Sequence, residues 1–388
     1  MSKSRKSLLI EWTLAGIVFL QNPPWFLWDN SYFYLSFLVL VLTVLCLERI
    51  VKTPFLLSRQ IPLIIFLIIF YIIYSSLGEF RFSSLVTILT FILLFFISES
   101  EKIAALKLIT IILSTIVSVS LIAWLYHNNV SNLPMFGFLN YGIGKGDDGN
   151  TILSNYILFV EEVSDTSNRF YSIFDEPGVL GTLASFVLFA NKYDFRSKSN
   201  IIIFIGGLFT FSLAFIGITI LGVFLINLKR SVMIIKGILA VIFLSLISFF
   251  VLRDNETFQM VVVDRILNID ESGINSRTPD NLNSFFDKFI LSSDLFLGKG
   301  TSFFKENSSL LSGQGYKLFI IEYGLIGFSL VLLMYLALAK KYSNIGNLCL
   351  LVFLISFLQR PSLFTAWQVI FFSLTVVNLH YLNNKSFK

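Results

Sequence analysis

A cation and two carboxylates lie close together in the segment Arg169-Phe-Tyr-Ser-Ile-Phe-Asp175-Glu176-Pro177-Gly178, directly before an apolar run. A carboxylate at a membrane surface can accept the proton of an attacking hydroxyl, and an arginine beside it can bind a phosphate or keep the carboxylate ionised. Helix capping is the alternative, because Pro suits the first helical position and an acidic residue before it accepts free backbone N–H groups. Glu176 and Asp175 are therefore candidate catalytic bases, and Arg169 is a candidate phosphate ligand.

Further arginines with the chemistry to bind phosphate lie in the segment 253–316 and beside the last apolar run. Arginine presents a planar fork of donors that matches phosphate oxygens, so several of them on one loop suit a diphosphate group. For any single arginine the alternative is a solvated charge, or an interfacial side chain in the case of the last one. The candidates are Arg253, Arg265, Arg277 and Arg360.

Other common chemistries find little support in the sequence. His127 and His380 are expected at opposite membrane faces, and no His, Cys and carboxylate cluster has metal-ligand spacing, so we expect no metal and no cofactor. The basic residues form no continuous patch, which argues against a nucleic-acid partner. Glu11 lies inside the first apolar run, where a carboxylate is costly to bury, and is a further functional candidate.

These residues must be positioned by membrane helices. Of the 388 residues, 55% are hydrophobic and 14% charged, a balance that a soluble fold cannot bury. Apolar runs near the roughly 20 residues needed to cross a bilayer recur from end to end. The sequence predicts an all-α integral membrane protein with one polytopic domain over 1–388. The expected spans are about 8–21, 31–47, 61–77, 82–98, 103–126, 178–191, 200–228, 232–252, 317–339, 345–358 and 362–382.

The long run 200–228 decides the topology. If it crosses twice, turning near Thr210-Phe-Ser212, the bases Lys229, Arg230 and Lys236 are cytoplasmic, as short basic loops usually are. This interpretation gives twelve crossings and places both termini in the cytoplasm. The two long loops, 127–177 and 253–316, then lie on the outer side.

The motifs resemble a known family. Arg169…Phe174-Asp-Glu176-Pro177-Gly178-Val-Leu-Gly181 resembles the Arg…Phe-x-Glu-Pro-x-x-x-Gly motif of the Wzy-type O-antigen polymerases and their ligase relatives, and Thr210-x-Ser212 is similar to that family's Thr-x-Ser turn. The resemblance covers roughly 165–330. Its later motifs are Ser276-Arg277, Leu297-Gly298-Lys-Gly300 and Glu322-Tyr-Gly324-Leu-Ile-Gly327.

The resemblance implies a metal-independent glycosyltransferase of the GT-C type in the bacterial inner membrane. Its donor would be a glycan on undecaprenyl diphosphate and its acceptor a lipid-linked repeat unit, whose hydroxyl displaces undecaprenyl diphosphate. Membrane lipids, a chain-length regulator and a flippase would be its partners. Gln314 and Tyr316, in a stretch where the family often has a His, are expected to line the substrate.

Three alternatives remain open. The first is an O-antigen ligase, against which the missing His weighs, while a capsule or exopolysaccharide polymerase has the same chemistry as the main interpretation. The second is a transporter or flippase of lipid-linked glycan, which should show internal repeats and interrupted spans. The third is a scaffold, which would tolerate loss of Arg169, Glu176 and Arg277.

Overall fold

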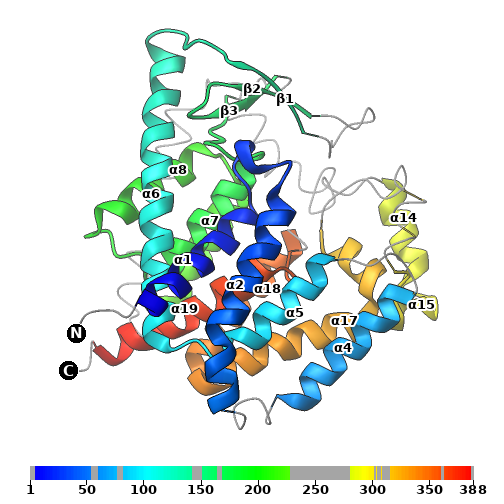
Figure 1. The fold of residues 1–388 in the computed structure, drawn as a ribbon. Helices are drawn as coiled ribbons and strands as arrows, with labels where there is room; N and C mark the ends of the chain where they lie inside the picture. Colours follow the sequence, from blue (N-terminus) through cyan, green and yellow to red (C-terminus); the bar gives the residue numbers. More distant parts are fainter. Residues whose placement is uncertain are drawn as a thin grey trace. The chain divides into compact units, whose positions relative to one another are not determined.

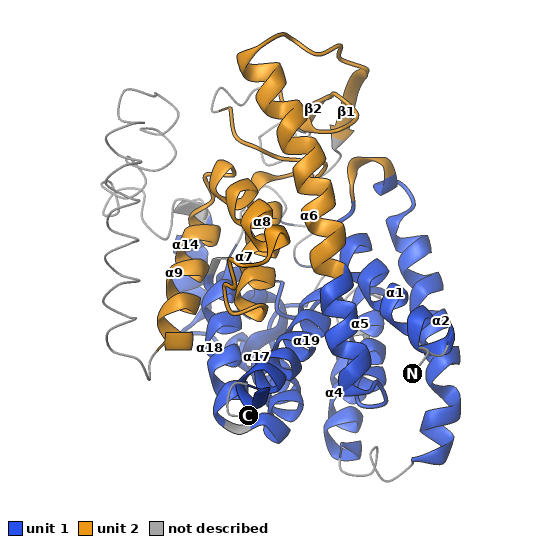
Figure 2. Cartoon of the chain, turned by 90° about the vertical axis from the view of Figure 1, so that its left-hand side faces the viewer, with its two compact units in different colours: residues 1–23, 27–108, 277–388 blue, residues 24–26, 109–276 orange. Residues whose placement is uncertain are grey.

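The structure is a computed structural model that describes residues 5–53, 60–76, 82–141, 151–163, 168–227, 280–300, 303, 307, 315–359 and 362–385. The chain divides into two compact units, which we describe separately (Figure 2). Unit 1 comprises residues 1–23, 27–108 and 277–388. Unit 2 comprises residues 24–26 and 109–276.

The described part of the chain is mostly helical (Figure 1). The elements up to Asn129 are α1 (Arg5–Leu20), the 3-10 helix η1 (Trp25–Leu27), α2 (Ser31–Lys52), α4 (Ile61–Ser76), α5 (Phe82–Leu94) and α6 (Glu99–Asn129). Unit 2 continues with β1 (Gly137–Tyr141), β2 (Thr151–Asn155), β3 (Val160–Glu162), α7 (Pro177–Ala190), α8 (Lys198–Phe209) and α9 (Leu213–Asn227). Unit 1 ends with α14 (Asp280–Phe289), α15 (Asp294–Leu297), α17 (Tyr316–Ala339), the 3-10 helix η4 (Lys340–Tyr342), α18 (Ser343–Gln359) and α19 (Ala366–Lys385).

The helices confirm the expectation of an α-helical membrane protein. Among the described residues, three helices are long and apolar enough to cross a bilayer: Ser31–Lys52, Glu99–Asn129 and Tyr316–Tyr342. Several shorter apolar helices accompany them. Helices also occupy the other expected spans, except for 232–252, which lies outside the described residues.

Unit 1 is built around α19. Every residue of this helix from Ala366 to Leu379 is buried, and the helix packs against α1, α5, α17 and α18. Its polar residues, such as Gln368 and Asn378, are therefore sheltered from lipid by neighbouring helices, as buried polar groups in a membrane require. The Tyr335 hydroxyl of α17 donates to the carbonyl of Leu363, just before α19, at 2.8 Å.

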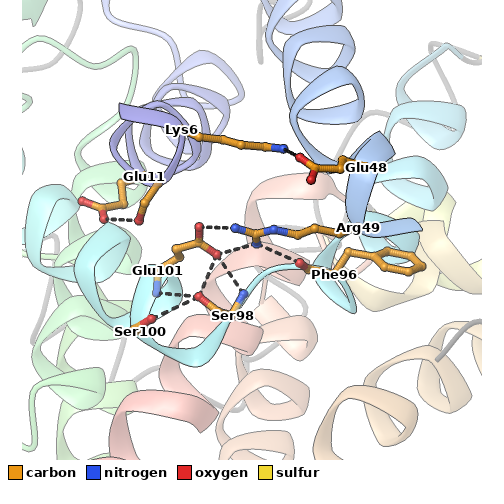
Figure 3. A network of polar contacts seen from close by, with 9 residues as sticks. Lys6, Glu11, Glu48, Arg49, Phe96, Ser98, Ser100 and Glu101 are labelled. Carbon is orange, nitrogen blue, oxygen red and sulfur yellow. Dashed lines mark hydrogen bonds and ion pairs between the residues drawn. The ribbon is translucent and has the colours of Figure 1, made fainter. Parts of the chain in front are cut away.

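A charged clamp joins the end of α2 to the start of α6 in unit 1 (Figure 3). The Arg49 guanidinium makes two parallel hydrogen bonds to the Glu101 carboxylate, at 2.6 and 2.7 Å, and a third to the carbonyl of Phe96 at 3.0 Å. The backbone N–H and hydroxyl of Ser98 also donate to Glu101. Bidentate arginine–carboxylate pairs are among the strongest side-chain contacts, so the clamp fixes the turn between α5 and α6.

The substitution Glu101→Gln is expected to lower the free energy of unfolding by about 2 kcal/mol, because it leaves Arg49 without its counter-charge in a half-buried site. Glu101 is 3% exposed and Arg49 31% exposed, so solvent screens the loss only in part. Glu48→Gln is the matched control, since Glu48 pairs with Lys6 and Lys52 on the surface. Thermal unfolding of the purified protein in detergent should show a lower midpoint for Glu101→Gln only, and equal midpoints would contradict the role given to the clamp.

Unit 2 is built around α7, which is buried along almost its whole length and packs against α8 and α9. The first long loop, in which the sequence analysis identified no strands, contains the three-stranded antiparallel sheet β1-β2-β3. Leu139 pairs with Leu153, and Leu153 pairs with Glu162. The sheet is therefore an addition to the expected all-helical architecture.

Candidate functional site

The motif around Glu176 begins helix α7. Glu176 has extended backbone angles, φ −140° and ψ 141°, at the position just before the helix, and Pro177 occupies the first turn. This start confirms the expected helix boundary. The Glu176 side chain, however, makes no capping hydrogen bond to the first turn of α7, so capping does not account for its carboxylate. Asp175 and Glu176 are both half-buried.

The expected turn at Thr210-Phe-Ser212 separates α8 from α9 and is held by its own hydroxyl groups. Thr210 Oγ1 donates to the carbonyl of Gly207 at 2.6 Å and accepts from the Ser212 N–H at 3.2 Å. Ser212 Oγ accepts from the N–H of Phe215 at 3.5 Å, in the first turn of α9. The two hydroxyl side chains thus satisfy backbone groups that the helix ends leave free. Both are buried, and the run 200–228 is two short helices, as its sequence predicted.

Arg169 binds this helical hairpin. Its Nε donates to the carbonyl of Thr210 at 3.0 Å, and the N–H of the next residue, Phe170, donates to the carbonyl of Phe209 at 3.0 Å. The guanidinium is half-buried and reaches the hairpin carbonyl through its inner nitrogen.

Gly181 of α7 allows the helix to approach the same hairpin closely. A Cβ at this position would lie 2.7 Å from Ser212 Cβ and 3.1 Å from Thr210 Oγ1. The pieces that the sequence singled out in this half of the chain, namely Arg169, the start of α7 and the Thr210–Ser212 hairpin, therefore meet within unit 2.

The backbone around Arg169 is strained. Asn168 has φ +41°, Ser172 φ +56° and Phe211 φ +47°, conformations that residues other than glycine rarely adopt. Such strain costs about 1–3 kcal/mol per residue, persists only where the surroundings impose it, and clusters at functional sites. The surroundings therefore hold the segment 168–172 and the hairpin in one fixed backbone conformation.

The backbone conformation of this segment is imposed by contacts with residues that the sequence analysis did not identify. Ser172 accepts at its carbonyl from the N–H of Val160 at 2.8 Å, and its hydroxyl lies 2.6 Å from the Ser120 hydroxyl of α6. The carbonyl of Ile173 accepts from the N–H of Trp25 at 3.0 Å. These partners lie far away in sequence, and no local pattern signals them.

The other predicted site residues lie in unit 1 or outside the described residues. Tyr316 begins α17 in unit 1 and places its ring edge against Phe286, with centroids 6.2 Å apart. Glu11 is 3% exposed within unit 1, and the Ser7 hydroxyl donates to it at 3.3 Å. Outside the described residues lie Arg253, Arg265, Arg277, Gln314 and Arg360.

A second cluster of contacts, in unit 1, brings together two motifs that lie far apart in the sequence, around Gly298 and around Gly324. Helix α17 is interrupted at Gly324, which has φ 63° and ψ −173°. The carbonyls before the break accept from outside the helix: Ile321 from the N–H of Lys299 at 2.7 Å, and Glu322 from the N–H of Gly300 at 3.1 Å. The Tyr74 hydroxyl of α4 donates to the carbonyl of Tyr323 at 2.6 Å.

Glycine is required on both sides of this contact. Gly298 has φ +79°, and a Cβ there would lie 2.4 Å from the carbonyl oxygen of Glu322. A Cβ at Gly324 would lie 2.4 Å from the carbonyl oxygen of Phe296. The turn 294–300 and the break in α17 form one unit, which we call the glycine junction.

Within the described ranges, no group of three or more His, Cys, Asp or Glu side chains is placed to hold a metal ion. The motif residues of unit 2 that could take part in chemistry are Arg169 and the carboxylates of Asp175 and Glu176. Comparison of the sequence with protein-family models and with curated proteins finds no match.

Proposed function

We propose that the chain is a glycosyltransferase of the bacterial inner membrane that polymerises undecaprenyl-diphosphate-linked repeat units into O-antigen or a related surface polysaccharide. The observation that carries this proposal is the meeting of Arg169, the Glu176–Gly181 start of α7 and the Thr210–Ser212 hairpin in unit 2. These are the residues in which the chain resembles Wzy-type polymerases. The membrane helices provide the setting in which polyprenyl tails are held.

In the proposed reaction, a sugar hydroxyl of the acceptor attacks the anomeric carbon of the donor glycan. The bond between that carbon and the diphosphate oxygen breaks, and the diphosphate takes the bonding electrons. The hydroxyl proton passes to a carboxylate, for which Glu176 and Asp175 are the candidates. Arg169 stabilises the charge that develops on the diphosphate, with Arg253, Arg265, Arg277 and Arg360 as further phosphate ligands.

Transport of a lipid-linked glycan is the second candidate function, because transporters bind substrate at interrupted membrane helices, and α17 is interrupted at Gly324. Ligation to lipid A-core remains an alternative with the same donor. The proposed sidedness, with the site on the outer face and both termini in the cytoplasm, follows from the basic residues between the spans.

Deleting the coding sequence from its host tests the proposal. A polymerase mutant should still make surface glycan with single repeat units and should lose the ladder of longer chains on a gel, and the wild-type chain should restore it. A ligase mutant would instead lose all ligated glycan, including single units. Either that result or an unchanged ladder would contradict the proposal.

For Glu176→Gln we expect a loss of the long-chain ladder of about 100-fold, because the amide cannot accept the proton of the attacking hydroxyl. The substitution keeps the side-chain shape, and the original carboxylate makes no capping bond, so α7 should stay intact. Asp194→Asn is the control, since Asp194 is an exposed acid of the same unit. A wild-type ladder from Glu176→Gln, at normal protein abundance, would refute the assignment of Glu176 as the base.

A further inference from the structure

The second long loop folds in part onto unit 1 through α14 and α15. Leu282 and Phe289 of α14 are buried against Ile321 of α17, with Phe285 and Phe286 packed around them. Lys317 of α17 also donates a hydrogen bond to the Asn283 side chain of α14 at 2.6 Å. The apolar face of α14 is therefore already covered by the chain's own residues.

The turn between α14 and α15, and the end of α15, expose a different set of apolar side chains. Leu291 is 87% exposed and Phe296 60% exposed, and Ile290 and Leu297 are exposed beside them. We call these four residues the apolar tip. Large apolar groups gathered in this way rarely face water without a partner.

The glycine junction fixes the position of the tip. Phe296 and Leu297 directly precede Gly298, whose backbone meets Glu322 and Gly324 of α17. Lys299 adds an ion pair to Asp294 at 2.6 Å, across the same turn. The tip is thus held at the break in a helix that is long and apolar enough to cross a membrane. Figure 1 shows α15 beside α17.

The exposed side of the neighbouring helix α4 indicates the level of the tip relative to the membrane. Tyr74, near the last residue of α4, donates to the carbonyl of Tyr323, so the end of α4 and the tip both adjoin the break. The outward side of α4 is a continuous apolar surface that suits lipid. Its exposed residues are Ile61, Ile65, Phe66, Ile68, Ile69, Ile72 and Ile73. This surface ends where α4 ends, at the level of the tip.

We infer that the apolar tip is a membrane-surface anchor, which inserts Leu291 and Phe296 into the leaflet at the level where α4 ends. Amphipathic elements of this kind bury their apolar side chains roughly 5–10 Å into the boundary between headgroups and acyl chains. Four side chains are too few for a protein partner, because a stable interface buries about 800 Å² on each side. The inference does not depend on the proposed enzymatic function.

Fluorescence quenching in vesicles tests this anchor. A nitrobenzoxadiazole probe is attached to Leu291→Cys and, as a matched control, to Ser284→Cys, an exposed position of α14. Both native cysteines, Cys46 and Cys349, are buried, so the wild-type chain should take up no label. The labelled proteins are reconstituted into phosphatidylethanolamine and phosphatidylglycerol vesicles, with or without a nitroxide near the top of the acyl chain.

At Leu291→Cys we expect blue-shifted emission, about twofold quenching by the nitroxide lipid and little quenching by aqueous iodide. At Ser284→Cys we expect emission without a blue shift, little quenching by the nitroxide lipid and strong quenching by aqueous iodide. If iodide quenches the probe at Leu291→Cys as strongly as an exposed probe at Ser284→Cys, the tip lies in water and the inference is overturned. A probe at Leu291→Cys that is shielded from both quenchers would mean that protein covers the tip, and would overturn it as well.

Discussion

Gly324→Ala is expected to cost about 3 kcal/mol or more of folding stability, because both the backbone conformation and the nearest backbone atom exclude a methyl group at this position. The backbone at this residue, φ 63° and ψ −173°, is in a region open almost only to glycine. The added Cβ would also lie 2.4 Å from the carbonyl oxygen of Phe296, a backbone atom that cannot turn away. Gly298→Ala should have a similar effect, because its Cβ meets the carbonyl of Glu322.

Gly217→Ala is the control for both substitutions. Gly217 lies inside α9, and a Cβ there meets nothing within 4 Å. Alanine is favoured over glycine inside a helix by about 1 kcal/mol, so this variant should be as stable as the wild type or more so. Thermal unfolding and gel filtration in detergent provide the comparison. If Gly324→Ala and Gly217→Ala unfold at the same temperature, the glycine junction does not hold the chain as described.

Arg169→Ala is expected to lower the yield of long-chain glycan by about 100-fold or more, the usual cost of removing a preorganised donor to a developing anion. Arg169→Lys should restore little of it. A lysine has no planar fork, so it cannot donate to the Thr210 carbonyl and bind a diphosphate in the same geometry. Glycan ladders from host cells, normalised to the amount of inserted protein, provide the measurement.

Arg196→Ala separates this effect from a general loss of positive charge. Arg196 is an exposed base of the same unit, in the short connection between α7 and α8. Its removal should leave the ladder unchanged. A normal ladder from Arg169→Ala would remove Arg169 from the proposed site, whatever its structural role in holding the hairpin.

Local patterns in the sequence predicted most of the apolar helices among the described residues, but not α14 and α15. Apolar run length located these apolar helices, and Pro177 after Glu176 marked the start of α7. The hairpin at Thr210–Ser212 followed from the need to keep the next bases on the cytoplasmic side, and the helix break is there. These features depend on residues that are neighbours in the chain.

Contacts between distant residues could not be predicted in the same way. The Gly298-Lys-Gly300 turn has no local signal for its contact, because its partner Gly324 lies far along the chain, inside α17. The pairing of Arg49 with Glu101, which lies on another helix, likewise has no local signal in the sequence. The strands of the first long loop are short and lack a clear apolar–polar alternation, so no local pattern indicated them.

Within the candidate site, the sequence identified the residues but not their geometry. Arg169, Glu176 and Ser212 were each singled out by motif, and the structure brings their segments together. The role of Ser120 and Trp25 in fixing the strained segment depends on tertiary contacts alone. Nothing in the sequence near these two residues distinguishes them from ordinary helix and loop positions.

Chain growth by the purified protein is the most direct test of the proposed polymerase. The wild-type chain is incubated in detergent with undecaprenyl-diphosphate-linked repeat units, and both polymer length and released undecaprenyl diphosphate are measured. A polymerase should produce a ladder of products, with one undecaprenyl diphosphate released for each new glycosidic bond. Because detergent leaves no sealed compartment, transport cannot produce this result. Substrate that stays as single units, with no release of undecaprenyl diphosphate, would refute the proposed polymerase.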